Sequence, residues 1–269
     1  MPALDVRTLT YPAGDPAWVP FTYNVPDTVF TAAGQTAAPR VVISGEQHFI
    51  CTHITATVNG LAPAAGSFRA LVRRNLDQFS NQAMDVSLLF GTGLRPHYLA
   101  APFINTPSTN LGADLLSGAA GTVALQFHGI QVNSKELEMV RAGVPSLFLP
   151  NGYAVSFFAY DVTRQYVASE REKMQIKTPG EYDFLLTEVN SFSTGQFASR
   201  LSWSGDVALD DNLTPGAGYF GTAQFPGYLN PIFVPATATL TGDNKDTSAA
   251  ANLIEMSWAG VRYPHGLKV

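Results

Sequence analysis

The chain has 269 residues, of which 46% are hydrophobic and only 14% are charged, and its formal net charge is −5. This length allows one large core or two modest ones, and the acidic balance argues against nucleic-acid binding as the main task. A single cysteine, Cys51, excludes an intrachain disulfide bond and a cysteine-based zinc cluster, and we expect it to be a small core residue.

Neither a membrane anchor nor an export signal is visible in the sequence. No apolar run reaches the roughly 20 residues that a membrane-spanning helix needs, and the first residues lack the basic and apolar regions of a secretory signal. The low charge, combined with 23 glycines and 18 prolines, indicates many short strands joined by turns. It also predicts a surface that other molecules cover, because a soluble monomer normally uses more Lys and Glu to stay dispersed.

Residues 1–20 begin the chain with four prolines and no hydrophobic periodicity, which predicts an extended N-terminal arm. Residues 21–133 then show the strand pattern of a first β-sandwich or jelly roll. The clearest strand in this half runs from His48 to Val58, where polar and apolar residues alternate up to an Asn-Gly turn.

Residues 134–150 are predicted to link the two halves and to include a short helix. Ser134 can cap this helix, and Glu136 lies near the positive end of its dipole. Gly143, followed by Pro145, then stops it. We expect this helix to be part of a linker rather than a core element.

Residues 151–269 are predicted to form a second β-sandwich or jelly roll. Each half offers about seven to eight short strands separated by turns, a count and spacing typical of these folds. The pattern argues against parallel βαβ units, because no helices alternate with the strands. The sequence therefore predicts an all-β protein with two tandem jelly-roll-like β-sandwich domains.

An internal repeat supports this division. The stretch from Phe90 to Ile104 returns, without a gap, as the stretch from Phe220 to Val234. Seven of its fifteen positions are identical: Phe90/Phe220, Gly91/Gly221, Thr92/Thr222, Pro96/Pro226, Tyr98/Tyr228, Leu99/Leu229 and Phe103/Phe233. Three further blocks recur in the same order, the last with two extra residues: Phe21–Val25 as Phe158–Val162, Gly45–Thr52 as Gly180–Thr187, and Leu125–Ile130 as Ile254–Val261. Four ordered blocks predict that the domains are related by internal duplication.

No motif with a catalytic mechanism is present in the sequence, and we predict no catalytic, cofactor-binding or metal-binding residue. His48 and His53 lie five residues apart on one predicted strand, so they point to opposite faces and cannot share a metal ion. His128 has no histidine counterpart in the other half, which favours a structural role.

Two sets of residues recur in both halves and admit a binding role. Glu46 and Glu181 each follow a glycine at a strand entrance, where we expect them to stabilise a turn rather than to form a catalytic pair across a cleft. The repeated aromatic residues are suited to line a sugar-binding groove, but their recurrence at equivalent positions in both halves favours core packing. These aromatic pairs are Phe49/Phe184, Tyr98/Tyr228 and Phe103/Phe233.

The blocks F-x-Y-x-V, G-E-x-x-F and F-G-T…P-x-Y-L…F look like strand signatures of phage virion proteins. With the low charge and the proline-rich arm, the duplicated β-rich unit resembles the double jelly-roll major capsid proteins of icosahedral viruses with internal membranes. This resemblance implies that two barrels stand side by side and that three subunits form a trimer with a pseudo-sixfold outline. Such trimers would tile a shell around the genome, with no cofactor and no enzymatic activity.

The resemblance also implies where the protein acts and with what. Its partners would be copies of itself and other virion proteins, near an internal viral membrane and without direct contact to nucleic acid. The place would be a bacteriophage virion assembled in the host cytoplasm. Three alternatives stay open: a tailed-phage decoration, collar or head–tail protein; a carbohydrate-binding β-sandwich module; and a cupin-like enzyme, which would need a histidine-rich metal cluster.

Overall fold

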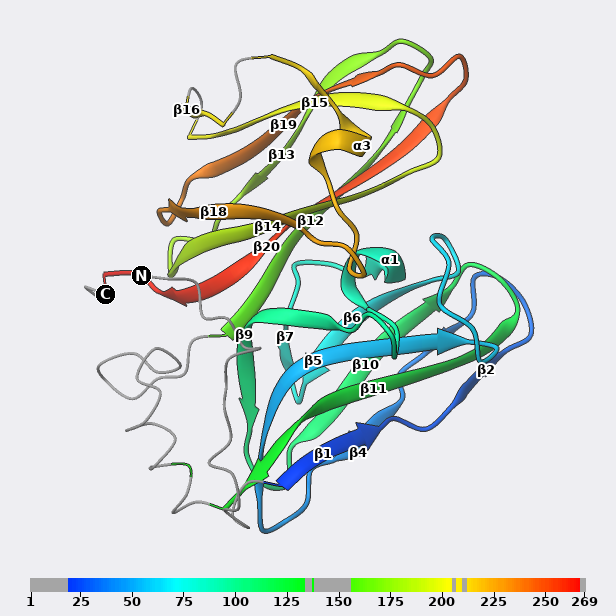
Figure 1. The fold of residues 1–269 in the computed structure, drawn as a ribbon, viewed down its shortest axis with the longest axis vertical. Coiled ribbons are helices and arrows are strands. Elements are labelled where there is room, and N and C mark those ends of the chain that lie inside the picture. The colour runs from blue at the N-terminus through cyan, green and yellow to red at the C-terminus, as the bar shows by residue number, and fades with distance from the viewer. Residues whose placement is uncertain (1–18, 134–136, 138–155, 205–206, 210–211, 267–269) are drawn as a thin grey trace. The chain divides into compact units, whose positions relative to one another are not determined.

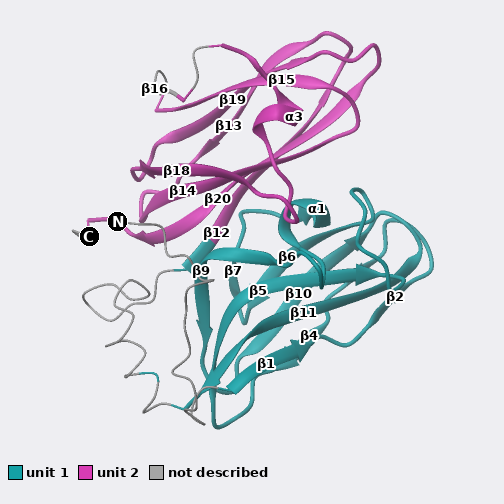
Figure 2. Ribbon diagram, viewed as in Figure 1, with its two compact units in different colours: residues 1–157, 269 teal, residues 158–268 magenta. Residues whose placement is uncertain are grey.

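The structure is a computed structural model, and it shows a chain built almost entirely of strands and turns (Figure 1). The residues that it describes are 19–133, 137, 156–204, 207–209 and 212–266. The chain divides into two compact units (Figure 2). Unit 1 consists of Met1–Phe157 with Val269, and unit 2 consists of Phe158–Lys268.

Unit 1 contains two sheets made of antiparallel ladders. The first sheet has the order β1-β11-β5-β9, with β2 also paired to β11. Its strands are β1 (Val19–Asn24), β2 (Thr28–Phe30), β5 (His48–Val58), β9 (His97–Asn105) and β11 (Gly121–Val132). The second sheet has the order β3-β10-β6-β7, with β4 on β10 and β8 on β6. Its strands are β3 (Thr36–Ala37), β4 (Arg40–Val42), β6 (Phe68–Arg74), β7 (Asp77–Gln78), β8 (Met84–Asp85) and β10 (Asn110–Ser117).

Unit 2 repeats this plan. Its first sheet has the order β12-β20-β14-β18, and its second has the order β13-β19-β15-β16, with β17 also on β15. The strands of the first are β12 (Ser156–Tyr166), β14 (Tyr182–Ser193), β18 (Gly227–Val234) and β20 (Asn252–Pro264). The strands of the second are β13 (Arg171–Lys177), β15 (Phe197–Trp203), β16 (Val207–Ala208), β17 (Thr214–Pro215) and β19 (Thr239–Asp246).

The strand order in both units defines a jelly roll. When the main strands of a unit are counted from first to eighth, one sheet runs first, eighth, third, sixth and the other runs second, seventh, fourth, fifth. In unit 1, β3 and β4 share the second place and β7 and β8 share the fifth; in unit 2, β16 and β17 share the fifth. Antiparallel strands in this order form the two Greek keys of a jelly roll, so the predicted fold class is confirmed.

Two predicted segments fall almost wholly outside the described residues: the arm at 1–20 and the linker with its short helix at 134–150. Val19 and Pro20, at the end of the predicted arm, already belong to β1. The boundaries of the two predicted sandwich domains, 21–133 and 151–269, stay predictions.

The repeated phenylalanines end the two short helices, α1 (Val86–Leu89) and α3 (Gly216–Tyr219). The backbone N–H groups of Phe90 and Phe220 donate to carbonyls four residues earlier, at 2.9 Å in both units. The same hydrogen bond therefore closes the same helical turn twice, which is what an internal duplication predicts.

Gly91 and Gly221 follow these helices in matching surroundings. A Cβ atom on either glycine would lie 2.1–2.5 Å from backbone atoms of the loop just ahead, which is closer than real atoms approach. Each glycine also exchanges backbone hydrogen bonds with the third main strand of its unit. These bonds are Gly91 to Ile54 at 3.2 Å, Ala56 to Gly91 at 3.0 Å, Gly221 to Val189 at 3.1 Å and Ser191 to Gly221 at 3.0 Å. Glycine recurs here because no other residue leaves the backbone room to pass.

A β-bulge recurs as well. The pairing of β5 with β11 leaves out Thr52, and the pairing of β14 with β20 leaves out Thr187. Each threonine hydroxyl donates to a carbonyl on the neighbouring strand at 3.3 Å, Thr52 to His128 and Thr187 to Ala259. Because a bulge bends its strand and increases the local twist, both sheets bend at the same place.

The strand register corrects one predicted block. Phe127 lies opposite Ile54 in unit 1, and Trp258 lies opposite Val189 in unit 2. This pairing matches Leu125 to Met256 and leaves no extra residue in the block, so the predicted match of Leu125 to Ile254 is wrong. Residues two apart on a strand share a face, and the sequence pattern alone therefore does not tell them apart.

A second correction concerns β9 and β18. Phe103 of β9 lies opposite Cys51 of β5. Leu186, which holds the place of Cys51 in unit 2, lies opposite Ile232 rather than Phe233. β18 therefore lacks one residue that β9 has, and this shift turns Phe233 to the other face of its sheet. The predicted equivalence of Phe103 and Phe233 is wrong for this reason.

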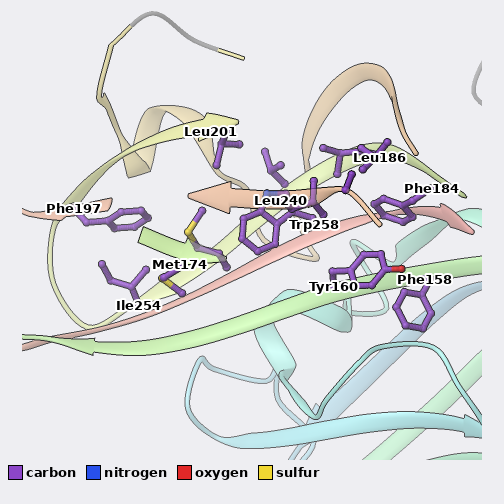
Figure 3. Packing of buried hydrophobic residues seen from close by; sticks show 14 of the residues in the cluster. Phe158, Tyr160, Met174, Phe184, Leu186, Phe197, Leu201, Leu240, Ile254 and Trp258 are labelled. Atoms are coloured by element: carbon purple, nitrogen blue, oxygen red, sulfur yellow. The ribbon is translucent and has the colours of Figure 1, made fainter. Parts of the chain in front are cut away.

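Alternating apolar residues fill both cores. In unit 2, Phe184 and Leu186 of β14 pack with Trp258 of β20 and with residues of β15 and β19 (Figure 3). Trp258, the largest of them, is 1% exposed. In unit 1, the fully buried aromatic residues include Phe49, Phe68, Phe90, Phe103 and Phe127. Burying one large apolar side chain stabilises a fold by roughly 1.5–3 kcal/mol, so these residues dominate the stability of each unit.

Candidate functional site

The search for a reactive centre starts from side chains that bind metals or attack substrates. Among the described residues, no three or more His, Cys, Asp or Glu side chains gather where they could hold a metal ion. The same residues include no helix with the length and apolar character needed to cross a bilayer. Cys51 lies in the core as predicted, and burial raises the pKa of its thiol well above the ordinary value. Its nucleophilic thiolate form is therefore disfavoured.

Two histidines that the sequence analysis treated separately come together on the first sheet of unit 1. The rings of His53 and His128 stack with their centroids 4.6 Å apart and an angle of 6° between planes. Hydroxyl groups fix the ring of His128: Thr22 lies 3.0 Å from its Nδ1 and Thr55 lies 2.8 Å from its Nε2. The pair forms because β5 and β11 are neighbours in a jelly roll and the bulge sets their side chains opposite each other.

Burial keeps both imidazoles neutral. Burial, together with repulsion from His128, lowers the pKa of His53 from 6.5 to about 4. Burial also lowers the pKa of His128. Unit 2 has Glu188 and Ala259 at the matching positions, so the pair belongs to one half only. With both nitrogens of His128 already held by hydroxyls, this pair acts as a structural stack, which agrees with the structural role predicted for His128.

Two other histidines lie apart from this pair. His97 is buried, and its Nδ1 lies 2.7 Å from the carbonyl oxygen of Leu89. His265 is more exposed, and its Nδ1 lies 3.0 Å from Oδ1 of Asp183, which is within hydrogen-bonding distance. Each therefore serves its own local contact.

The repeated carboxylates lie where the sequence placed them. Glu46 and Glu181 are exposed and occupy the turns that lead into β5 and β14. Their turn-stabilising role stays a prediction.

A second repeated acid, which the sequence analysis missed, is held by arginines. Asp114 of β10 accepts hydrogen bonds from Arg40 and Arg73. Asp243, at the matching place on β19, accepts from Arg171 at 2.7 and 3.0 Å. In both cases the arginines hold the pKa of the carboxyl below its ordinary value. The spacing of these two acids is close to the repeat offset and could have revealed them.

The repeated aromatic residues divide into buried and exposed members. Phe49 and Phe184 are fully buried, which confirms core packing for that pair. A tyrosine packs edge-on against each, with centroids 4.8 Å apart for Tyr23 and 5.0 Å for Tyr160. For the other two pairs the prediction fails in unit 2, because Tyr228 is 58% and Phe233 is 50% exposed.

The exposed aromatic residues gather on and beside β18, the last strand of its sheet. We call Phe225, Tyr228 and Phe233 the β18 patch; Phe225 is also 58% exposed. No residue of β18 is charged. A concentration of half-exposed aromatic rings on an uncharged edge strand marks a contact surface, and this patch is the candidate functional site.

Comparisons with known proteins add the following. No protein-family model and no curated protein matches the sequence. The chain is similar to the crystal structure of the STIV MCP, at 10% identity and a TM-score of 0.46 over 90% of this chain and 96% of that chain. It is also similar to the atomic structure of Sulfolobus Turreted Icosahedral Virus, at 9% identity and a TM-score of 0.48 over 90% of each chain.

A third likeness is to a quasi-atomic model of the PBCV-1 virus capsid, at 10% identity and a TM-score of 0.32 over 93% of this chain and 95% of that chain. At TM-scores below 0.5, the assignment of the jelly-roll fold stands on the strand pairings of this chain alone.

Proposed function

We propose that this protein is a virion structural protein, a shell subunit whose copies assemble into the container of a viral genome. The observation that carries the proposal is a duplicated jelly roll with apolar, uncharged residues exposed on an edge strand. Jelly rolls occur in capsid proteins, lectins and cupins alike, so the fold by itself leaves the function open. The surface favours assembly, because large exposed apolar patches mark sites of contact between proteins.

The finer part of the proposal is a homotrimer. Each copy contributes two similar units, so three copies around one axis would present six similar units, which is the pseudo-sixfold outline that the resemblance to double jelly-roll capsid proteins implies. Further proposed partners are other virion proteins and, nearby, an internal viral membrane. The net charge of −5 favours a role without direct nucleic-acid contact. A bacteriophage origin and assembly in the host cytoplasm stay predictions from the sequence.

Light scattering coupled to size-exclusion chromatography tests the proposal on the purified full chain. We expect a discrete oligomer, with three copies as the predicted number, that persists on dilution because obligate interfaces bury upwards of about 2,000 Å². A stable monomer at every concentration would contradict the proposal. The number of copies per particle, measured by quantitative mass analysis of virions, then separates a main shell subunit from a decoration, collar or head–tail protein.

A carbohydrate-binding module is the second candidate, because the exposed rings of Phe225 and Tyr228 also suit stacking against sugars. Glycan binding by a stable monomer, lost on replacing Tyr228 with alanine, would favour this candidate. Glycan binding by an oligomer would instead add a receptor role to a shell protein.

A further inference from the structure

The β18 patch has a counterpart strand that is covered by its own unit. In unit 1, β9 holds the same place in its sheet as β18 does in unit 2, yet Phe103 is only 1% exposed. The ring of Phe79 stacks on Phe103 with centroids 4.2 Å apart. At the place of Phe79, unit 2 has Leu209, whose N–H donates to Leu201 as that of Phe79 donates to Val72. Ile232 holds the place of Phe103 in unit 2, and Phe233 lies on the opposite face of its sheet, so β18 exposes a ring that β9 does not.

The chemistry of the β18 edge differs from that of another exposed edge strand in the same unit. β13 ends the other sheet of unit 2, and its charged residues Arg171, Glu172, Lys173 and Lys177 are all exposed. Charged edges are the usual protection of a strand that faces water. β18 lacks this protection, although it lies at an edge too. The contrast indicates that β13 stays in contact with water, whereas a partner covers β18.

A second edge strand, in unit 1, has the same uncharged character. β1 contains no charged residue, and its Val19 and Phe21 are 43% and 39% exposed. β1 is the first main strand of unit 1 and β18 is the sixth main strand of unit 2, and each lies at one end of its sheet. The two exposed apolar edges are therefore different surfaces, one on each unit.

Both edges also contain a proline, Pro20 in β1 and Pro231 in β18. Proline has no backbone N–H and interrupts the row of donors that an added strand would need. A partner therefore contacts these strands through side chains rather than by continuing the hydrogen-bond ladder.

We propose that the β18 patch of one copy packs against Val19 and Phe21 on β1 of the next copy, head to tail. The inference rests on the proposed self-assembly and names the surfaces that perform it. A contact of the β18 patch with itself would be two-fold symmetric and would leave the β1 residues in water. A contact between different surfaces covers both on every copy once the ring closes, so the exposed apolar edges of both units leave water together.

Charge substitutions at exposed positions test the contact without disturbing a core. Phe233→Lys and Val19→Lys each place a cation in the proposed interface, while Val167→Lys, at a position 66% exposed in unit 2, is the matched control. We expect each interface variant to weaken association at least about tenfold, since truncating or charging a central contact costs 1.4 kcal/mol or more. The control should assemble like the unchanged chain, and all variants should keep the same unfolding temperature as dissociated subunits.

Cysteine cross-linking tests the pairing itself. A Val19→Cys chain mixed with a Phe233→Cys chain under oxidising conditions should give a mixed disulfide-linked pair, detected by mass; Cys51 is buried and stays outside the reaction. Cross-linking of Phe233→Cys chains to each other in preference to the mixed pair would overturn the head-to-tail contact.

The outcomes separate the inference from the proposed function. If the unchanged chain assembles and both lysine variants assemble equally well, the named surfaces are wrong while the shell role stands. If the unchanged chain is a monomer throughout, the shell role fails and the inference fails with it.

Discussion

β9 and β18 descend from one repeated strand, and they have opposite surroundings. Both follow the same glycine turn, and β9 begins with His-Tyr-Leu where β18 begins with Gly-Tyr-Leu. Yet β9 is largely buried and β18 is largely exposed. One missing residue accounts for Phe233, because the shorter β18 presents Phe233 on the face opposite to the one that its ungapped match, Phe103, occupies in β9. The comparison shows that a repeated strand can turn an aromatic side chain from the core to the surface when the strand is one residue shorter.

The sharpest test of this comparison replaces the two phenylalanines. Phe103→Ala removes a ring that is 1% exposed and stacked on Phe79, so we expect it to destabilise unit 1 by about 3–5 kcal/mol. Phe233→Ala removes a half-exposed ring and should change the stability of unit 2 by less than about 1 kcal/mol. Urea unfolding of dissociated subunits measures both. Equal losses would show that the two residues are equivalent after all.

The repeated glycines should respond alike rather than differently. Gly91→Ala and Gly221→Ala each force a Cβ atom to within 2.1–2.5 Å of backbone atoms, and we expect a loss of about 1–3 kcal/mol in either unit. Gly93→Ala is the control, because nothing lies within 4 Å of its added Cβ atom. Thermal unfolding followed by calorimetry checks the three variants. A neutral effect at only one of the two repeated glycines would contradict the shared turn.

The histidine stack should make the stability of unit 1 sensitive to acid. The pKa of His53 is about 4 in the folded chain against 6.5 ordinarily, so the unfolded chain binds more protons between these values. Stability therefore falls as the pH drops through this window and is fully present above it. We expect His53→Gln to reduce the loss of unfolding temperature between pH 7 and about pH 4. An unchanged slope in His53→Gln would contradict the prediction.

The smallest expected effect concerns the repeated acids of the second sheets. Asp114→Asn and Asp243→Asn each remove a carboxylate held by arginine, at a cost of about 0.2–1 kcal/mol because these pairs are partly exposed. Both carboxyl pKa values are lowered, so the stabilisation is present above pH 3.8 and is lost as the pH falls below it. The free energy of unfolding, measured at pH 7 and at low pH and in each case at low and high salt, gives the difference. A loss that is independent of both pH and salt would point to packing instead of charge.

Much of the fold was predictable from the repeat. The recurring glycines, phenylalanines and strand patterns indicate two jelly rolls, because each meets a backbone requirement that the fold imposes twice, as Gly91 and Gly221 show. The sequence did not reveal the register within β9 and β18. The two strands still align residue by residue without a gap, although the residue that β18 lacks places its later side chains on the other face. Nor did it reveal the stack of His53 on His128, which depends on strands 75 residues apart becoming neighbours. The exposure of the β18 patch was missed for the same reason, since the matching of aromatic residues between the halves favoured a core.

Pro20 and Pro231 bear on how such a chain avoids fibrils. A protein made in many copies, with uncharged β edges that attract one another, is at risk of stacking strand on strand into an endless amyloid-like ladder. A proline within each edge strand removes a donor that such a ladder would need. In the proposed assembly, contact between copies is thereby confined to side chains, and we expect replacement of both prolines with threonine to make the chain form thioflavin-positive fibres.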